Sequence, residues 1–221
     1  EKGMEIVNAI VKFFQEGGAF MYPIMGVFAI GAAIAIERYA YLTVAKQKNR
    51  SMWNKLTPLV KANNYEQAMA ISSRSKSEVG KIMAYGLSRL RMTKRRDDIE
   101  IAMEEGLMEV IPRLEKRTHY LATFANIATL LGLLGTIIGL IQAFNAVANA
   151  NPADKADLLS ASISVAMNTT AFGLMAAIPL LLMFTVLQTK TTEIVDSMEM
   201  ATVKFLNSIT EYSKKTARND D

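Results

Sequence analysis

The stretch from Thr118 to Pro152, THYLATFANIATLLGLLGTIIGLIQAFNAVANANP, decides the fold of this protein. It contains no Asp, Glu, Lys or Arg, and neither does a second long apolar stretch from Leu158 to Thr189. A helix rises about 1.5 Å per residue, so about 20 apolar residues cross the hydrocarbon core of a bilayer. Both stretches are long enough to do so. The sequence therefore predicts an integral membrane protein.

A third apolar block lies near the start of the chain. Ala19 to Ile36 reads AFMYPIMGVFAIGAAIAI, with Pro23 in its first turns, where a missing N–H is tolerated. The 51% of hydrophobic residues among 221 are concentrated in these three blocks, and the charged residues lie between them. This distribution predicts an all-α protein with three transmembrane helices.

The basic residues predict the orientation of these helices. Sixteen Lys and Arg lie between residues 44 and 118 and five follow the last span, whereas the hairpin between spans two and three has only Lys155. The N-terminal segment has only Lys2 and Lys12. Cytoplasmic loops carry the excess of positive charge, so we expect the N-terminus outside, the C-terminus inside and membrane lipids around the spans.

Outside the spans the apolar residues recur at helical spacing. Met4–Glu16 predicts an amphipathic helix, either interfacial or simply packed, and short helices are expected at 51–63, 65–73, 78–91 and 97–117. The last should run unbroken into span two, with a kink at Pro112, and span three should continue as a long cytoplasmic helix, with disorder from Lys214. The predicted segments are an interfacial helix (1–18), transmembrane helix 1 (19–43), a cytoplasmic helical domain (44–117), transmembrane helix 2 (118–148), a periplasmic hairpin (149–157), transmembrane helix 3 (158–189) and a cytoplasmic helical tail (190–221).

Composition argues against several classes of function. The chain has no Cys and one His, so thiolate chemistry and a histidine metal cluster are excluded. The sequence pI near 9.2 is better explained by membrane orientation than by nucleic-acid binding, because acids are interleaved with the bases. We expect no enzymatic activity, no resident metal, no cofactor and no nucleic-acid partner.

The interiors of spans two and three carry small and hydroxyl residues. Gly135 and Gly139, and Ala128 and Gly132, form small-xxx-small steps that let helices approach closely, and Gly173 is expected to pack in the same way. Thr129 and Thr136 lie seven residues apart on one face of span two, and Thr169 lies on a face of span three that includes Gly173. The sequence predicts two hydroxyl-bearing faces.

These motifs resemble the ExbB/TolQ/MotA family of inner-membrane ion-channel motor subunits. The resemblance rests on Leu130–Ile141 with Ala143-Phe144, on Leu114-Glu115, and on Asn168–Leu174 with Ala177–Pro179, in that family's order and separation. With three spans the chain is more similar to the ExbB/TolQ branch than to the four-span flagellar stators.

The resemblance implies a ring of five subunits in a bacterial inner membrane. Its inner face would be lined by Thr136, Thr169 and Thr170, with Thr129 also in the ion pathway, and would enclose a single-span ExbD/TolR-like subunit that supplies an Asp. Inward flow of Na⁺ or H⁺ would then drive a TonB- or TolA-like protein that reaches the outer membrane, for import or envelope maintenance. The alternative is a membrane scaffold or adaptor that conducts no ion.

One position departs from the family pattern. ExbB and TolQ carry a Glu five residues before the second threonine of span three, and that position is Val165 here. The pair Thr169-Thr170 is similar to the double threonine of sodium-driven stators. Hydroxyls without a second acid suit a hard cation such as sodium, so we favour sodium and leave the proton open.

Overall fold

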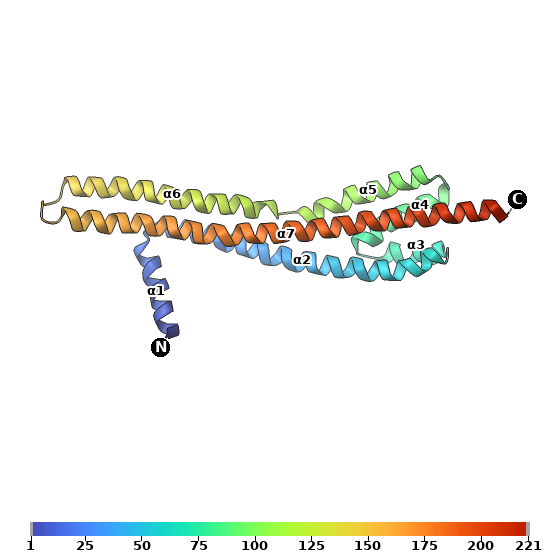
Figure 1. The fold of residues 1–221 in the computed structure, drawn as a ribbon, viewed down its shortest axis with the longest axis horizontal. Helices are drawn as coiled ribbons and strands as arrows, with labels where there is room; N and C mark the ends of the chain where they lie inside the picture. Colours follow the sequence, from blue (N-terminus) through green and yellow to red (C-terminus); the bar gives the residue numbers. More distant parts are fainter. Residues whose placement is uncertain (1, 220–221) are drawn as a thin grey trace. The chain divides into compact units, whose positions relative to one another are not determined.

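The computed structural model describes residues 2–219, and within that range the chain is helical with no strand. The helices are α1 (Lys2–Glu16), α2 (Met21–Lys61), α3 (Tyr65–Arg74), α4 (Glu78–Met92), α5 (Arg96–Glu115), α6 (His119–Ala148) and α7 (Lys155–Asn219), as Figure 1 shows. The stretches containing α2, α6 and α7 are long and apolar enough to cross a membrane. The predicted fold class is confirmed.

The chain divides into two compact units. Unit 1 comprises residues 1–37 and 117–186, and unit 2 comprises residues 38–116 and 187–221. The helices α2 and α7 contribute residues to both, since each continues through the division without interruption. The predicted extension of span three is therefore one helix, and α7 remains helical through Lys214, where disorder was expected. The last two residues lie outside the described range.

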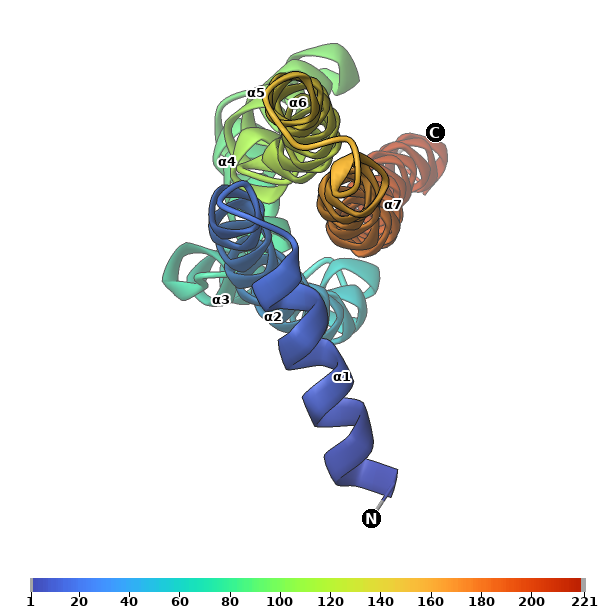
Figure 2. The same cartoon turned by 90° about the vertical axis from the view of Figure 1, so that its left-hand side faces the viewer.

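Unit 1 contains an antiparallel pair, α6 and α7, with α1 running crosswise to it (Figure 2). The end of α1 is fixed by aromatic rings: Phe14 packs edge-on against Phe172 of α7 and Tyr22 of α2, at ring-centroid distances of 5.9 and 5.3 Å. Gly18, at φ 78°, makes the turn into α2. No residue of α1 is buried, which fits the predicted amphipathic helix.

Unit 2 is a bundle of α3, α4, α5 and the second halves of α2 and α7. Large apolar side chains form its core, and several are completely buried: Leu42, Leu56, Met83, Ile99, Met103, Leu114 and Phe205. Asn64 and Ser77 cap α3 and α4, each accepting a hydrogen bond from a backbone N–H three residues on. These caps explain why α3 and α4 begin at their predicted positions, residues 65 and 78.

Two predicted helix boundaries are wrong. The helix expected from residue 51 is the end of α2, because no Gly or Pro occurs between residues 39 and 57 to interrupt it. The continuous helix expected through residue 117 is broken into α5 and α6, and the break lies at residues 116–118 rather than at Pro112. Arg117 takes a left-handed backbone conformation there, with φ 65°, which ends α5.

Candidate functional site: the threonine cluster between α6 and α7

The helices α6 and α7 approach each other through glycine. A Cβ atom added to Gly173 would lie 2.7 Å from the carbonyl oxygen of Ala128, and one added to Gly132 would lie 3.2 Å from that of Thr169. The first distance leaves no room for a side chain, and the second would require the opposing backbone to shift by a few tenths of an ångström. The backbones therefore pack directly on each other, which brings the polar groups of the two helices within reach.

Thr136 and Thr170 meet at this crossing. Their hydroxyl oxygens are in direct contact, and that of Thr136 lies 3.1 Å from the carbonyl oxygen of Ala166 on α7. The carbonyl oxygen of Gly132 on α6 lies 3.2 Å from both hydroxyls. Four oxygen atoms from two helices thus form one cluster, and both threonines are half-buried. We call these four residues the threonine cluster: Gly132, Thr136, Ala166 and Thr170.

Thr169 bonds in a different direction. It is 2% exposed, and its hydroxyl donates to the carbonyl oxygen of Gly17 at 2.5 Å, with the carbonyl of Val165 at 3.1 Å. Gly17 follows the last residue of α1, so this bond satisfies a carbonyl that the helix end leaves free. Thr169 therefore ties the α1–α2 turn to α7, one residue from the threonine cluster.

The remaining predicted site residues are spread along α6. Thr129 donates to the carbonyl oxygen of Ala125 in its own helix at 3.1 Å, and in the described part of the chain no bond joins it to the threonine cluster. Gly135 faces the Thr169 side chain, and a Cβ on Gly139 would lie 3.0 Å from that of Ala166. The glycines thus lie along the α6–α7 contact, and the structure separates Thr129 from the other three threonines.

The two helices that form the cluster carry no acid, lysine or arginine over the lengths that flank it. From residue 120 to 153, and again from 158 to 189, the sequence has no Asp, Glu, Lys or Arg. Val165 lies one turn before Thr169, is 36% exposed, and would contact a Cβ on Gly18 at 3.3 Å. In the described residues no group of three or more His, Cys, Asp or Glu could hold a metal. The cluster offers only neutral oxygen ligands, which suit a hard monovalent cation.

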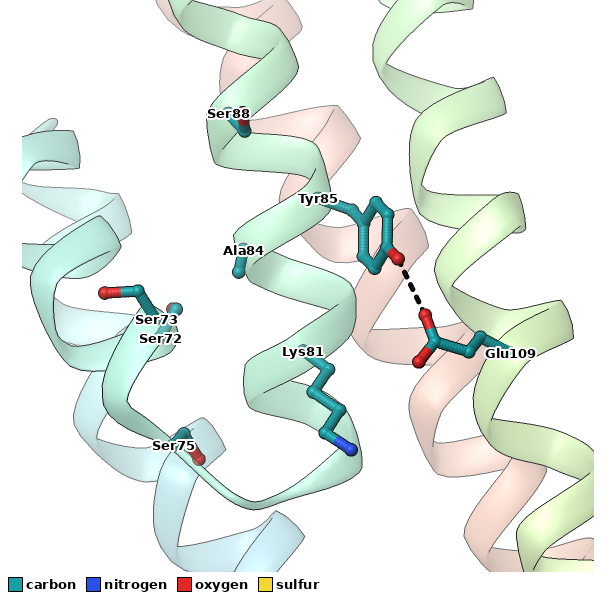
Figure 3. Close-up of a pocket in the computed structure, with 8 residues that line it drawn as sticks. All are labelled: Ser72, Ser73, Ser75, Lys81, Ala84, Tyr85, Ser88 and Glu109. Carbon is teal, nitrogen blue, oxygen red and sulfur yellow. Dashed lines mark hydrogen bonds between the residues drawn. The ribbon is translucent and has the colours of Figure 1, made fainter.

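A polar pocket in unit 2 is the other candidate site. It is an open pocket of about 450 Å³ between α3, α4 and α5, lined by serines and by three larger polar side chains, as Figure 3 shows: Lys81, Tyr85 and Glu109. The Tyr85 hydroxyl donates to Glu109 at 2.6 Å, and this bond raises the pKa of Tyr85 above its usual value of 10.0. The pair links α4 to α5.

Arg38 is a residue whose role sequence reasoning missed. Its position at the end of an apolar block predicts a side chain that extends toward water. Instead it is 1% exposed, and its guanidinium donates to the carbonyl oxygens of Arg113 and Leu114 at 3.0 and 2.7 Å. These carbonyls lie at the C-terminal end of α5, where intrahelical donors run out. Two features of the sequence could have indicated this role: an arginine near the end of a span, and a second helix whose last carbonyl groups need donors.

Comparison with known proteins places these features in a family of membrane channels. Residues 74–200 match the MotA/TolQ/ExbB proton channel family, and that range includes α5, α6, the threonine cluster and the first part of α7. The chain belongs to this family, as its resemblance predicted.

Individual relatives agree with the assignment. A homolog of biopolymer transport protein ExbB from Methanothermobacter thermautotrophicus is 25% identical over 195 residues, covering 87% of this chain and 68% of that protein. An ExbB-like biopolymer transport protein from Synechocystis is 25% identical over 167 residues, or 75% of this chain and 79% of that protein. The Tol-Pal system protein TolQ from Haemophilus influenzae is 38% identical over 78 residues, or 35% and 34% of the two chains.

Proposed function

We propose that this chain is the channel-forming subunit of an ExbB/TolQ-like motor in a bacterial inner membrane. Five copies form a ring around a single-span ExbD/TolR-like subunit, and inward flow of sodium or protons through the ring does mechanical work on a TonB- or TolA-like partner. The work supports import across the outer membrane or maintenance of the envelope. Family membership and the threonine cluster support this proposal.

The observation that carries the proposal is that neutral oxygen atoms cluster within spans that contain no acidic residue. Thr136 and Thr170 place hydroxyls beside two backbone carbonyls, in spans that hold no acid. A cation crossing there needs a counter-charge, because an unpaired ion in a low-dielectric interior is costly. The partner's Asp would supply that charge, so this chain contributes the neutral part of a shared pathway.

The energy available to such a motor sets its scale. One elementary charge moving across 100 mV releases about 2.3 kcal/mol. Two ions would release about as much as several net hydrogen bonds contribute to a folded protein. A discrete rearrangement of the partner helices lies within this range.

The test compares threonine variants in vesicles. The chain is co-purified with its single-span partner, reconstituted, and driven by a potassium-diffusion potential, while sodium- and pH-sensitive dyes follow the flux. Thr136→Val and Thr170→Val should each lower the flux at least tenfold. Thr185→Val is the matched control and should keep the flux, because within residues 2–219 the Thr185 hydroxyl bonds to Leu181 of its own helix and to nothing else.

The outcomes separate the alternatives. Loss of flux in both cluster variants, with assembly unchanged, supports the motor subunit. Equal flux in all variants would overturn the role of the threonine cluster in the ion pathway. No flux in the unmodified complex would leave a non-conducting scaffold as the better description. Transport that is the same in sodium-free and sodium-containing buffer would exclude sodium as the coupling ion.

A further inference from the structure

Two helices of unit 2 carry opposite net charges. The helix α5 contains seven acids and two bases, which gives a net charge of −5. The second half of α2, residues 39–61, contains five bases and no acid: Lys46, Lys48, Arg50, Lys55 and Lys61. All five bases are exposed, as are most of the acids. Single helices with this much uncompensated charge repel themselves unless a partner neutralises them.

The two charge sets do not neutralise each other within the chain. Among the described residues, no ion pair joins α5 to residues 39–61 of α2. Lys46 pairs with Glu193 of α7 at 2.8 Å, and Glu109 is occupied by Tyr85 and Arg113. Within unit 2, Figures 1 and 2 show α5 and the second half of α2 on different sides of α7. The charges of the two helices are therefore not paired with each other within the described residues.

The bases of α2 and the acids of α5 nevertheless lie at the same level along the bundle. The bonds from Arg38 to the end of α5 fix one level at which α2 and α5 meet, and the two helices run in opposite directions from there. Lys48 comes ten residues after Arg38, and Glu104 comes ten residues before Leu114. At about 1.5 Å per residue, both lie about 15 Å from that level. The basic and acidic sets thus occupy the same length of the bundle.

The acidic surface also has an apolar centre. Ile101 and Met108 of α5 are 61% and 74% exposed, and they lie on the same side of the helix as Glu104. On α2, Val44 is 46% exposed, one turn before Lys48. Exposed apolar residues within a charged rim are typical of a surface that packs against a protein.

We infer that α5 of one copy docks on the second half of α2 of the next copy, with Glu104 near Lys48. The contact joins two different surfaces of the same chain, and contacts of this kind close into rings when the rotation between copies allows it. Complementary charge sets the level and the direction of docking, and the apolar centre holds the pair together. The inference rests on the proposed ring and names the surfaces that build it.

Disulfide cross-linking tests the contact directly, because the chain has no cysteine of its own. The double variant Lys48→Cys with Glu104→Cys is expressed at full length, oxidised in its membrane, and run on a non-reducing gel. We expect a ladder of covalent oligomers that ends at the ring. Lys48→Cys and Glu104→Cys, co-expressed on separate chains, should give dimers and nothing larger. Lys48→Cys with Arg89→Cys is the matched control and should stay monomeric, because Arg89 lies on α4.

A charge swap tests the electrostatic part. Glu104→Lys should lower the oligomeric fraction several-fold at low salt, measured by light scattering of the purified chain, and adding Lys48→Glu to the same chain should restore it. Both substitutions are at exposed positions, so helix content by circular dichroism should not change.

The outcomes distinguish this inference from the proposed function. Oligomers that form normally without a Lys48–Glu104 cross-link would overturn the inference and leave the ring in place. The inference would also fail if the bases of α2 instead bind vesicles of anionic phospholipid and the swap does not restore assembly. A chain that stays monomeric with its partner subunit present would overturn the proposed ring itself.

Discussion

The two units differ in the size of the side chains that pack inside each of them. Within unit 1, most of the buried residues of α6 and α7 are alanines and glycines: Ala125, Ala128, Gly132, Gly135, Ala143, Ala166, Gly173, Ala176 and Ala177. The core of unit 2 buries leucine, isoleucine, methionine and phenylalanine instead. A single chain therefore uses two packing strategies, and α7 takes part in both.

The difference follows from the solvent of each unit. In water, burying a large apolar side chain contributes about 1.5 to 3 kcal/mol, so unit 2 gains most from large residues. Lipid tails are as apolar as leucine, so helices within a membrane gain little from such burial and associate through close backbone contact and interhelical hydrogen bonds. The hydroxyl cluster of unit 1 and its glycines thus have one common cause, which is that α6 and α7 touch along their backbones.

The largest expected effect comes from closing that backbone contact. Gly173→Ala places a methyl group 2.7 Å from the carbonyl oxygen of Ala128, and a backbone atom has no rotamer by which to move away. Overpacking of this kind costs about 2 to 3 kcal/mol. We expect faster amide exchange over residues 119–186 and a lower unfolding temperature in detergent.

Gly26→Ala is the control for this prediction. It lies in unit 1 on α2, and nothing lies within 4 Å of its added Cβ. It should leave amide exchange unchanged or slow it slightly, because alanine favours helix over glycine. If the two variants behave alike, the glycines serve some purpose other than close packing.

The sequence predicted much of the fold because the strongest signals are local. Apolar blocks without charge identified the three spans, and helical spacing of apolar residues located α3 and α4, which Asn64 and Ser77 cap in the structure. The break at Arg117 has no such signal, since a non-glycine residue at φ 65° is held by its surroundings. Pro112 was the expected weak point, yet α5 continues past it.

The sequence singled out threonines on α6 and α7, but it could not predict the contacts that they make. Helical spacing placed Thr136 and Thr169 on faces of their own helices, but spacing within one helix cannot show which residue of another helix it meets. The structure pairs Thr136 with Thr170 and turns Thr169 toward Gly17. Thr129 shares the Thr136 face and still lies outside the cluster, because it is two turns away along α6.

An intermediate loss of stability is expected when the buried charge of unit 2, that of Arg38, is removed. Arg38→Met keeps the length of the side chain and leaves the carbonyls of Arg113 and Leu114 without their donor. Hydrogen bonds from a charged group contribute about 1.5 to 3 kcal/mol, so we expect a loss of about 2 kcal/mol. The fluorescence of Trp53, the one tryptophan of the chain, reports on unit 2 during denaturation.

The control for this prediction lies on the same helix. Arg50→Met removes an exposed charge that makes no hydrogen bond in the described chain, and it should change stability little. A loss as large for Arg50→Met as for Arg38→Met would show that positive charge on α2, rather than the bonds to α5, stabilises unit 2.

The smallest effect is expected at the polar pocket, where an exposed hydrogen bond joins α4 to α5. Tyr85→Phe removes the donor to Glu109, and the loss of stability should be small because solvent competes for both groups.

The loss of stability in Tyr85→Phe should also depend on pH. The bond raises the pKa of Tyr85 in the folded protein, so its contribution is complete below pH 10 and falls as pH rises through the raised pKa. The unmodified protein and Tyr85→Phe should therefore differ in Trp53-monitored unfolding at pH 8 and converge at strongly alkaline pH. A difference that is constant across that range would mean that the hydroxyl group contributes through its packing and not through the proton that it donates to Glu109.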